Sequence, residues 1–352
     1  MSAQQTSRVA MIGLGMVSAT YVDALSNMGE NIQLKGVLSS HPETAKSFVN
    51  KHYPAAQGPT PEIYTSVAAI AGDPAIDFVL LTTPPDARQT LVSALASAGK
   101  PVLMEKPIER TLAAAIELCE LCETSQVPLG IMLQHRARPS AQALQNIVSD
   151  DATGPLHAVE ISVPWWREQT YYDQPGRGSY ARDGGGVMIS QAIHTLDLAL
   201  QFTGPVKDVI ALTATTGLHS MEAEDFVSAG LRFANGAVGS MLGSTASYPG
   251  RTEEIILHYE KVSATLTSSL LILDWHNASS ETIGEQAATG AGADPMAFTS
   301  DWHRFMIENF QAALHGDTQL LASARSALSV HALIDALERS GRNGQREMLK
   351  LF

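Results

Sequence analysis

A glycine-rich turn near the N-terminus carries the first residues whose types and spacing could do chemistry. Gly13 and Gly15 follow the apolar run Arg8–Ile12 and precede a helical stretch. Gly13 permits a tight turn, and Gly15 lets the backbone approach a pyrophosphate at the helix N-terminus. Ser18 replaces the third glycine of the usual dinucleotide pattern but is still small enough for close packing of helix on strand. We therefore predict a nucleotide-binding turn that also includes Met16 and Val17.

The elements that must position this turn alternate between apolar runs and helical stretches over residues 1–134. The apolar runs after the first are Gln33–Leu38, Ile76–Leu81, Pro101–Met104 and Leu129–Leu133. This alternation predicts an α/β domain of the Rossmann type, with a parallel sheet and a ligand crevice at the carboxyl ends of its strands. Residues that could line this crevice follow the runs: Ser39, Ser40, Thr82, Thr83, Pro84, Arg88, Glu105, Lys106 and Gln134.

The end of the second run bears on the choice between NAD and NADP. An NAD site usually carries an acid there, which binds the ribose hydroxyls and repels a 2′-phosphate. Ser39-Ser40-His41 offers none, and the first acid, Glu43, already lies in the next helix. The serines could equally cap that helix. We expect NAD(P)(H) as cofactor, with a lean towards NADP.

Length and charge narrow the class of protein. The 352 residues predict about two domains with substantial cores. A net charge of −13 makes nucleic acid a poor partner. Cys119 and Cys122 lie late in a predicted helix without a second cysteine pair, so we expect structural thiols and no metal site. No leader pattern and no apolar run of membrane-spanning length occur, so we expect a cytoplasmic protein without membrane contact.

The pattern changes in the second half, where strand-like runs follow one another with short turns. They are Leu156–Val163, Val206–Ala214, Phe226–Phe233, Ala237–Ser244, Glu253–Tyr259, Val262–Thr267 and Leu270–Asp274. With helices near Val187–Phe202, Phe298–His315 and Leu320–Arg339, they predict an α+β domain over residues 135–352. Its large, mostly antiparallel sheet would leave one face open. We expect homo-oligomerisation through that face.

Three motifs resemble those of the Gfo/Idh/MocA family, which includes glucose–fructose oxidoreductase and inositol dehydrogenase. They are Glu105-Lys106-Pro107, the turn Thr82–Arg88 with Arg88 where His is usual, and the stretch Gly184–Asp197. The resemblance covers nearly the whole chain. It implies a Rossmann domain, a second domain that binds substrate, and an NAD(P)-dependent oxidoreductase acting on a ring hydroxyl or carbonyl of a sugar, cyclitol or sugar derivative. It also implies a homodimer or homotetramer.

Hydride transfer gives the motif residues their expected roles. Oxidising an alcohol requires a group that takes the hydroxyl proton and a group that stabilises developing charge on oxygen. Lys106 could hydrogen-bond the reacting hydroxyl as a cation, and His194 could act as the acid/base; the resemblance implies the same roles. Ser190 stands where the family has Asp, so it can orient a hydroxyl but holds no charge. Gln191 is a further expected substrate contact.

An aromatic-dense segment, Trp165–Tyr180, leads into the glycine run before His194. Aromatic rings and arginines could stack on sugar faces and bind ring hydroxyls. The alternative is a loop that packs on the sheet, because Trp and Tyr also fill cores. We interpret the segment as a substrate wall, with Trp166, Arg167, Tyr172 and Arg182 as contacts.

Two alternatives stay open at the level of sequence. One is an epimerising or glycoside-processing enzyme that retains its nicotinamide, which cofactor retention after turnover would distinguish. The other is a regulator that senses NADP without chemistry. Lys106 and His194 speak against the regulator, and Ser190 is its best support.

Overall fold

The computed structural model describes residues 6–53, 59–149, 152–285, 292 and 298–352. Contacts divide the chain into two compact units. The first comprises Met1–Glu109, Ala113–Met132 and Thr299–Ala324, and the second comprises Arg110–Leu112, Leu133–Phe298 and Arg325–Phe352. The sequence suggested a single cut between residues 134 and 135. The units differ from that division because a late segment returns to the first unit.

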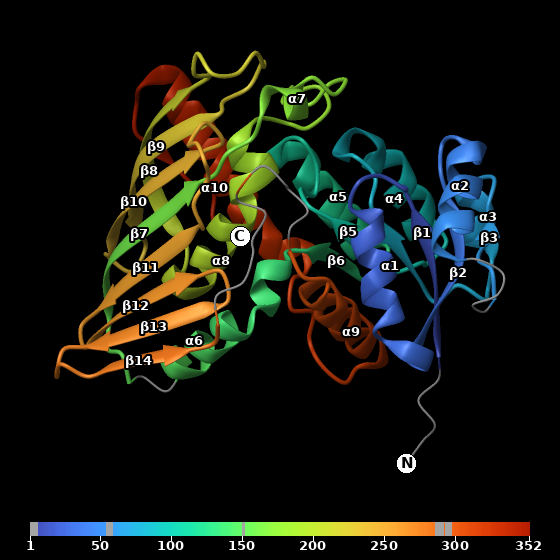
Figure 1. Cartoon of the computed structure of the whole chain (residues 1–352), viewed down its shortest axis with the longest axis horizontal. Coiled ribbons are helices and arrows are strands. Elements are labelled where there is room, and N and C mark those ends of the chain that lie inside the picture. The colour runs from blue at the N-terminus through green and yellow to red at the C-terminus, as the bar shows by residue number, and fades with distance from the viewer. Residues whose placement is uncertain (1–5, 54–58, 150–151, 286–291, 293–297) are drawn as a thin grey trace. The chain divides into compact units, whose positions relative to one another are not determined.

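The first unit contains a six-stranded sheet in the order β3-β2-β1-β4-β5-β6, and every pair in it is parallel (Figure 1). Its strands are β1 (Ser7–Ile12), β2 (Ile32–Leu38), β3 (Glu62–Ile63), β4 (Phe78–Leu81), β5 (Val102–Glu105) and β6 (Leu129–Met132). Its helices are α1 (Ser18–Ser26), α2 (Pro42–His52), α3 (Val67–Gly72), α4 (Arg88–Ser97), α5 (Leu112–Thr124) and α9 (Asp301–His315). The strand order reverses between β1 and β4. A ligand crevice is expected at the carboxyl ends of these two strands, and this is where the glycine turn lies.

Helix α9 belongs to the first unit because its apolar face packs there. The Phe310 ring lies 5.2 Å from the Phe78 ring of β4. Gly130 in β6 leaves the necessary space, since a Cβ there would lie 2.7 Å from Phe310. Gln311 also donates to the Ser7 hydroxyl at 2.9 Å. The sequence pattern located this helix but not the partner on which it packs.

The second unit contains a nine-stranded sheet in the order β14-β13-β12-β11-β7-β10-β9-β8-β15. Its strands are β7 (Leu156–Pro164), β8 (Val206–Ala214), β9 (Phe226–Phe233), β10 (Val238–Ser244), β11 (Glu254–Tyr259), β12 (Val262–Thr267), β13 (Leu270–Trp275), β14 (Ser280–Ile283) and β15 (Glu347–Met348). Within this second sheet, as far as the structure describes it, only the β7–β10 pair is parallel. The α/β assignment with a mostly antiparallel second sheet is therefore confirmed.

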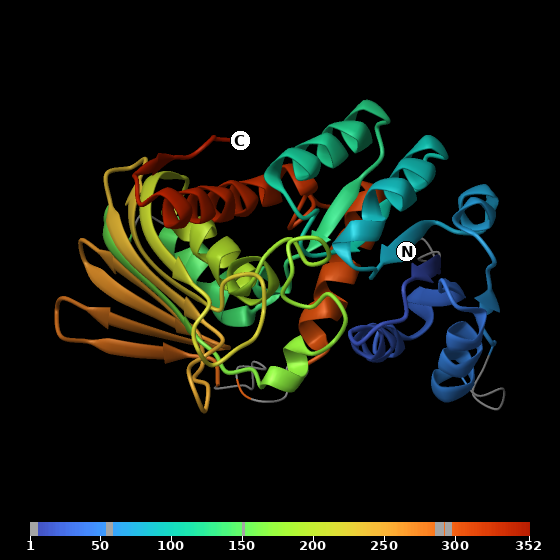
Figure 2. The same cartoon turned by 90° about the horizontal axis from the view of Figure 1, so that it is seen from above.

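Helices cover one face of this sheet (Figure 2). They are α6 (Pro139–Ser149), α8 (Ile193–Thr203) and α10 (Ala324–Asn343), and the short α7 (Gln169–Tyr172) lies in the segment after β7. Buried and exposed residues alternate along β9, as in a sheet with one solvated face. The Gly, Ala, Ser and Thr content of Ser279–Asp294 predicts a loop there. The structure instead places strand β14 within this stretch, and most of its remainder lies outside the described residues.

Candidate active site

The glycine turn of the first unit has the geometry of a nucleotide-binding turn. Gly13 has a φ of +98°, and a Cβ there would lie 2.8 Å from the Thr83 backbone nitrogen, so only glycine fits. A Cβ on Gly15 would meet no atom within 4 Å, so its small size is not needed for packing within the protein. The open space at Gly15 is what a pyrophosphate approaching α1 requires. Val17 precedes α1, and Met16 is exposed.

Thr82 and Arg88 join this turn to the ends of β4 and β5. The Thr82 hydroxyl donates to the Gly13 carbonyl at 2.6 Å. The Arg88 guanidinium, 2% exposed, donates to the Thr83 carbonyl at 2.7 Å and to the Lys106 carbonyl at 3.4 Å. Burial lowers the pKa of Arg88 to about 10, which still leaves it charged at neutral pH. Arg88, expected as a cofactor contact, thus fixes the backbone that follows β4 and the backbone that follows β5.

Buried polar atoms in both units test whether these residues fit a nicotinamide dinucleotide. The Thr83 hydroxyl and the Arg88 Nη1 in the first unit have no hydrogen-bond partner among the described residues. The same holds for the Gln134 Oε1 in the second. Such buried groups cost free energy unless a ligand or water satisfies them. Thr83 and Arg88 therefore fit a polar ligand at the end of β4, and when bound the nicotinamide would supply or accept a hydride.

Lys106 follows β5 and is half-buried beside a cis peptide bond to Pro107. Its neighbour Glu105 is buried and accepts a hydrogen bond from the Tyr21 hydroxyl at 2.8 Å. Burial raises the pKa of Glu105 and lowers the pKa of the adjacent His303 to about 3. His303 is therefore neutral, although its Nε2 lies 3.8 Å from Glu105. Tyr21 on α1 thus anchors the residue that precedes the lysine, a contact that the sequence did not reveal.

His194 lies in the second unit, one residue into α8. A π-helical turn, Met188–Ala192, precedes α8, and such turns occur often at functional sites. The Glu224 carboxylate accepts from the Gly186 and Met188 amides at 3.1 Å each, although burial raises its pKa. A Cβ on Gly186 would lie 1.8 Å from the Glu224 carbonyl oxygen. The glycine run and Glu224 therefore fix the start of the helix that carries the histidine.

Ser190 and Gln191 lie within the π-helical turn. Ser190 is half-buried, whereas Gln191 is 4% exposed. The Gln191 side-chain nitrogen donates to the Tyr171 hydroxyl at 3.2 Å, and its oxygen has no partner in the described part of the chain. Gln191 thus retains an acceptor for a ligand, and Tyr171 is a further candidate that the sequence reasoning did not single out.

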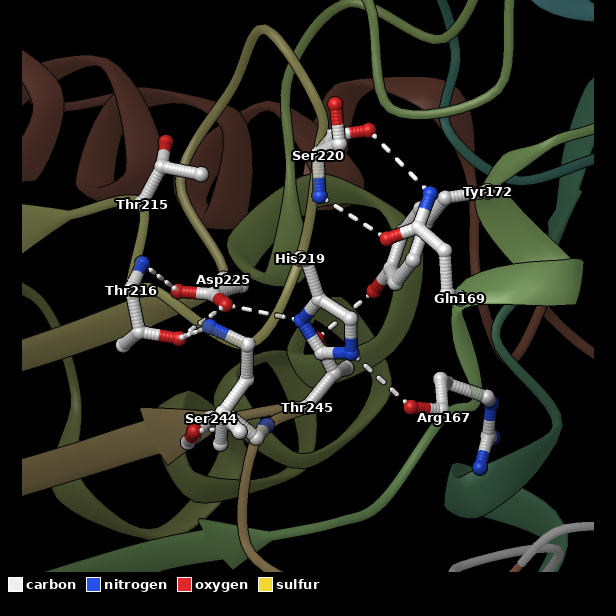
Figure 3. A network of polar contacts seen from close by, with 12 residues as sticks. Arg167, Gln169, Tyr172, Thr215, Thr216, His219, Ser220, Asp225, Ser244 and Thr245 are labelled. Atoms are coloured by element: carbon white, nitrogen blue, oxygen red, sulfur yellow. Dashed lines mark hydrogen bonds and ion pairs between the residues drawn. The ribbon is translucent and has the colours of Figure 1, made fainter.

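A buried polar network holds the aromatic segment in place (Figure 3). The His219 Nε2 lies 2.9 Å from the Arg167 carbonyl oxygen, and its Nδ1 lies 2.7 Å from Asp225. Thr216 donates to Asp225 through both its amide and its hydroxyl. His219 also lies against Trp166, with ring centroids 5.8 Å apart. The network fixes the backbone that follows the half-buried Trp166, and neither His219 nor Asp225 stood out in the sequence.

The other expected substrate contacts bind protein groups. Arg167 is 2% exposed and donates to the carbonyls of Trp166 and Gly292 at 2.7 Å each. The Tyr172 hydroxyl lies 2.6 Å from that of Thr245 (Figure 3), and Arg182 donates to the Pro175 carbonyl. These three side chains shape the segment, which agrees with the packing alternative.

The sequence predicts neither a metal site nor a membrane-spanning segment. Among the described residues, no group of three or more His, Cys, Asp or Glu could hold a metal ion, and no helix is long and apolar enough to cross a membrane. Cys119 and Cys122 are buried and unbridged, and burial raises the pKa of Cys122 to about 11, which disfavours a reactive thiolate.

Comparisons with known proteins identify the family of the chain. Residues 7–133 match the oxidoreductase family with an NAD-binding Rossmann fold, and residues 141–265 match the GFO/IDH/MocA C-terminal domain. D-apiose dehydrogenase of Paraburkholderia graminis is 27% identical over 82% of this chain and 77% of its own. Inositol 2-dehydrogenase of Rhizobium meliloti is 23% identical over 95% of this chain and 97% of its own.

A solved structure covers the whole fold. The WlbA dehydrogenase of Bordetella pertussis, in complex with NADH and UDP-GlcNAcA, superposes with a TM-score of 0.82 at 26% identity. The match covers 99% of each chain. The two family matches span most of the chain and both of its units, so the chain belongs to the GFO/IDH/MocA family of oxidoreductases with an NAD-binding Rossmann fold.

Proposed function

We propose that the protein transfers hydride between a nicotinamide cofactor and a ring hydroxyl or carbonyl of a sugar, cyclitol or sugar derivative. One observation carries the proposal: the hydrogen bonds from Thr82 and Arg88 join the glycine turn to the lysine-bearing strand end. The chain also holds the two residue types that alcohol oxidation needs, a lysine (Lys106) and a histidine (His194). The names of the two dehydrogenase relatives, which act on apiose and inositol, support this substrate class.

In the proposed reaction, Lys106 binds the substrate oxygen as a cation and stabilises the charge that develops there. His194 takes the hydroxyl proton while the carbon loses its hydride, so an alcohol becomes a ketone or lactone. The reverse reaction returns the same proton from His194. Ser190 and the Gln191 oxygen orient ring hydroxyls. The cofactor supplies only the hydride acceptor or donor.

We further propose that NADPH is preferred over NADH. No acid follows β2. The Ser39 hydroxyl accepts a hydrogen bond from the His41 amide at 3.3 Å, Ser40 and His41 are exposed, and Glu43 is paired with Lys46 at 2.8 Å. Nothing in this turn repels a 2′-phosphate, whereas an acid would.

A screen of sugars and cyclitols with both oxidised cofactors, followed by nicotinamide absorbance, tests both points. We expect turnover of at least one compound, with a higher kcat/KM for NADP+. Ser39→Asp should move the preference towards NAD+ by about tenfold or more, because it adds one negative charge beside the ribose. Ser39→Asn is the uncharged control. Tight NADPH binding without turnover across the panel would instead favour the sensing regulator.

The open face of the second sheet supports a homo-oligomer. Ile210 and Leu212 on β8, Val238 on β10 and Met348 on β15 are 51%, 63%, 52% and 57% exposed. These strands belong to the same end of the sheet, in the order β10-β9-β8-β15. Apolar side chains grouped in this way mark association surfaces. We propose a dimer or tetramer formed through this face.

We expect light scattering to give a mass of at least twice 37.5 kDa, and Leu212→Glu to shift it towards the monomer. Leu218→Glu is the matched control, since Leu218 is 58% exposed but lies outside the strands. A monomeric wild-type protein would contradict the proposal.

A further inference from the structure

A second histidine lies against His194 within the second unit. The ring centroids of His135 and His194 are 4.9 Å apart, with their planes inclined by 32°. His135 belongs to the 3-10 turn Gln134–Ala137 that follows β6, and it is 4% exposed. The side chain expected to move the proton therefore rests on a buried aromatic ring that is itself titratable.

The contacts of His135 fix which of its nitrogens carries the proton. The Arg138 Nη2 lies 2.6 Å from the His135 Nε2. A guanidinium has only donors, so Nε2 accepts and the ring proton lies on Nδ1. A second proton on His135 would bring an imidazolium against the guanidinium, at a cost in free energy.

Arg138 is itself held in place. The same Nη2 donates to the Glu253 Oε1 at 2.6 Å, and both side chains are nearly inaccessible, at 3% and 2% exposure. The Trp165 indole donates to the other oxygen of Glu253 at 3.2 Å. Hydrogen bonds thus link four buried residues in the order Trp165, Glu253, Arg138 and His135. The last of these lies against the His194 ring.

We propose that His135 is a positioning residue: held by Arg138 as a neutral imidazole with its proton on Nδ1, it fixes the orientation of the His194 ring. The inference rests on the proposed role of His194 in proton transfer. A neutral ring can stack on His194 in both protonation states, and its π face favours the imidazolium that forms when His194 takes the substrate proton. A charged ring in the same place would oppose that step.

The charges around the pair are consistent with this role. Helix α8 packs on the 3-10 turn, the π-helical turn, α6, β7 and β11. The π-helical turn and α6 carry no charged residue. Asp197 on α8 is bound by Arg136 of the 3-10 turn. The titratable residues of β7 and β11 are His157 and Glu160, both exposed, Glu254 and His258, both half-buried, and the buried Tyr259. The Arg138 guanidinium contacts the His135 ring directly.

Nuclear magnetic resonance of the full chain labelled with [15N]histidine tests the proposal without any substrate. His135→Phe and His194→Gln assign the two rings. We expect His135 to remain neutral with its proton on Nδ1 from about pH 5 to 9, while His194 titrates. An Nε2–H tautomer, or protonation of His135 within this range, would overturn the proposal.

Variants separate positioning from packing. With the most active compound of the screen, His135→Ala should lower kcat about tenfold or more and change KM less than about threefold, because only the orientation of His194 is lost. His135→Phe keeps a neutral ring and should recover kcat to within about threefold of the wild type. In the neutral double variant Arg138→Gln/Glu253→Gln, His135 should gain a proton at low pH, and the titrations of the two rings should become coupled.

The outcomes also separate this inference from the proposed function. If His194→Gln retains full turnover, the proposed role of His194 in proton transfer is wrong, whatever the tautomer of His135. If His194→Gln is inactive but His135→Ala matches the wild type in kcat and pH profile, the positioning role of His135 is wrong and the role of His194 remains. If the double variant Arg138→Gln/Glu253→Gln does not fold, the kcat of His135→Phe and the measured tautomer of His135 still test the positioning role.

Discussion

Lys106→Ala should lower kcat by about three orders of magnitude or more, while the Kd for the nicotinamide cofactor changes little. The lysine is the cation placed to stabilise charge on the reacting oxygen, and that interaction strengthens as the reaction proceeds. The glycine turn, Thr82 and Arg88 keep their mutual contacts without the Lys106 side chain, because Arg88 binds the backbone carbonyl of this residue. Binding and catalysis should therefore separate.

Steady-state kinetics and a cofactor titration by protein fluorescence measure the two effects. Lys46→Ala is the matched control, because it removes one positive charge from an exposed position on α2 of the same unit. We expect the control to retain wild-type turnover. Near-normal turnover of Lys106→Ala on a verified substrate would show that the lysine takes no part in the mechanism. It would also contradict the proposed reaction.

Most of the first sheet could be predicted closely from the sequence because its strands other than β3 are short, mostly buried apolar runs between helices. Strand β3, with two residues, and helix α3, with six, carry too little pattern to be found. The membership of α9 could not be predicted for another reason. It depends on the fit of Phe310 against Gly130 and Phe78, which are distant in sequence.

Motifs located the backbone of the candidate site better than its side-chain contacts. The positions of Gly13 in a turn and of Lys106 after a strand could be predicted because a turn and a strand end impose recognisable residue types. Arg167 and Tyr172 were predicted to face substrate, yet they are buried against protein groups, since arginine and tyrosine serve either purpose. The partners Glu224 and Asp225 escaped notice because a single buried carboxylate has no periodic signature in a sequence.

Asp197→Ala should destabilise the second unit strongly. The Asp197 carboxylate receives two hydrogen bonds from the Arg136 guanidinium, at 2.8 and 2.6 Å, and the side chains are 1% and 3% exposed. Removing one partner of a buried pair leaves the other charge without compensation, at a cost of about 3–5 kcal/mol. The contact of Arg136 with the Ser326 hydroxyl at 3.1 Å is with a neutral group and cannot replace the carboxylate. For a unit of this size the thermal midpoint should fall by roughly 10 °C.

A double variant distinguishes the loss of charge compensation from the loss of packing. Arg136→Met/Asp197→Leu replaces both charges with apolar groups and should recover most of the stability, because no buried charge remains. Glu43→Ala breaks an exposed pair with Lys46 and should change the free energy of unfolding by about 0.5 kcal/mol or less. Scanning calorimetry compares the four proteins. If Asp197→Ala melts like Glu43→Ala, the pair does not hold α8 against the 3-10 turn. If the double variant is as unstable as the single one, packing outweighs charge at this site.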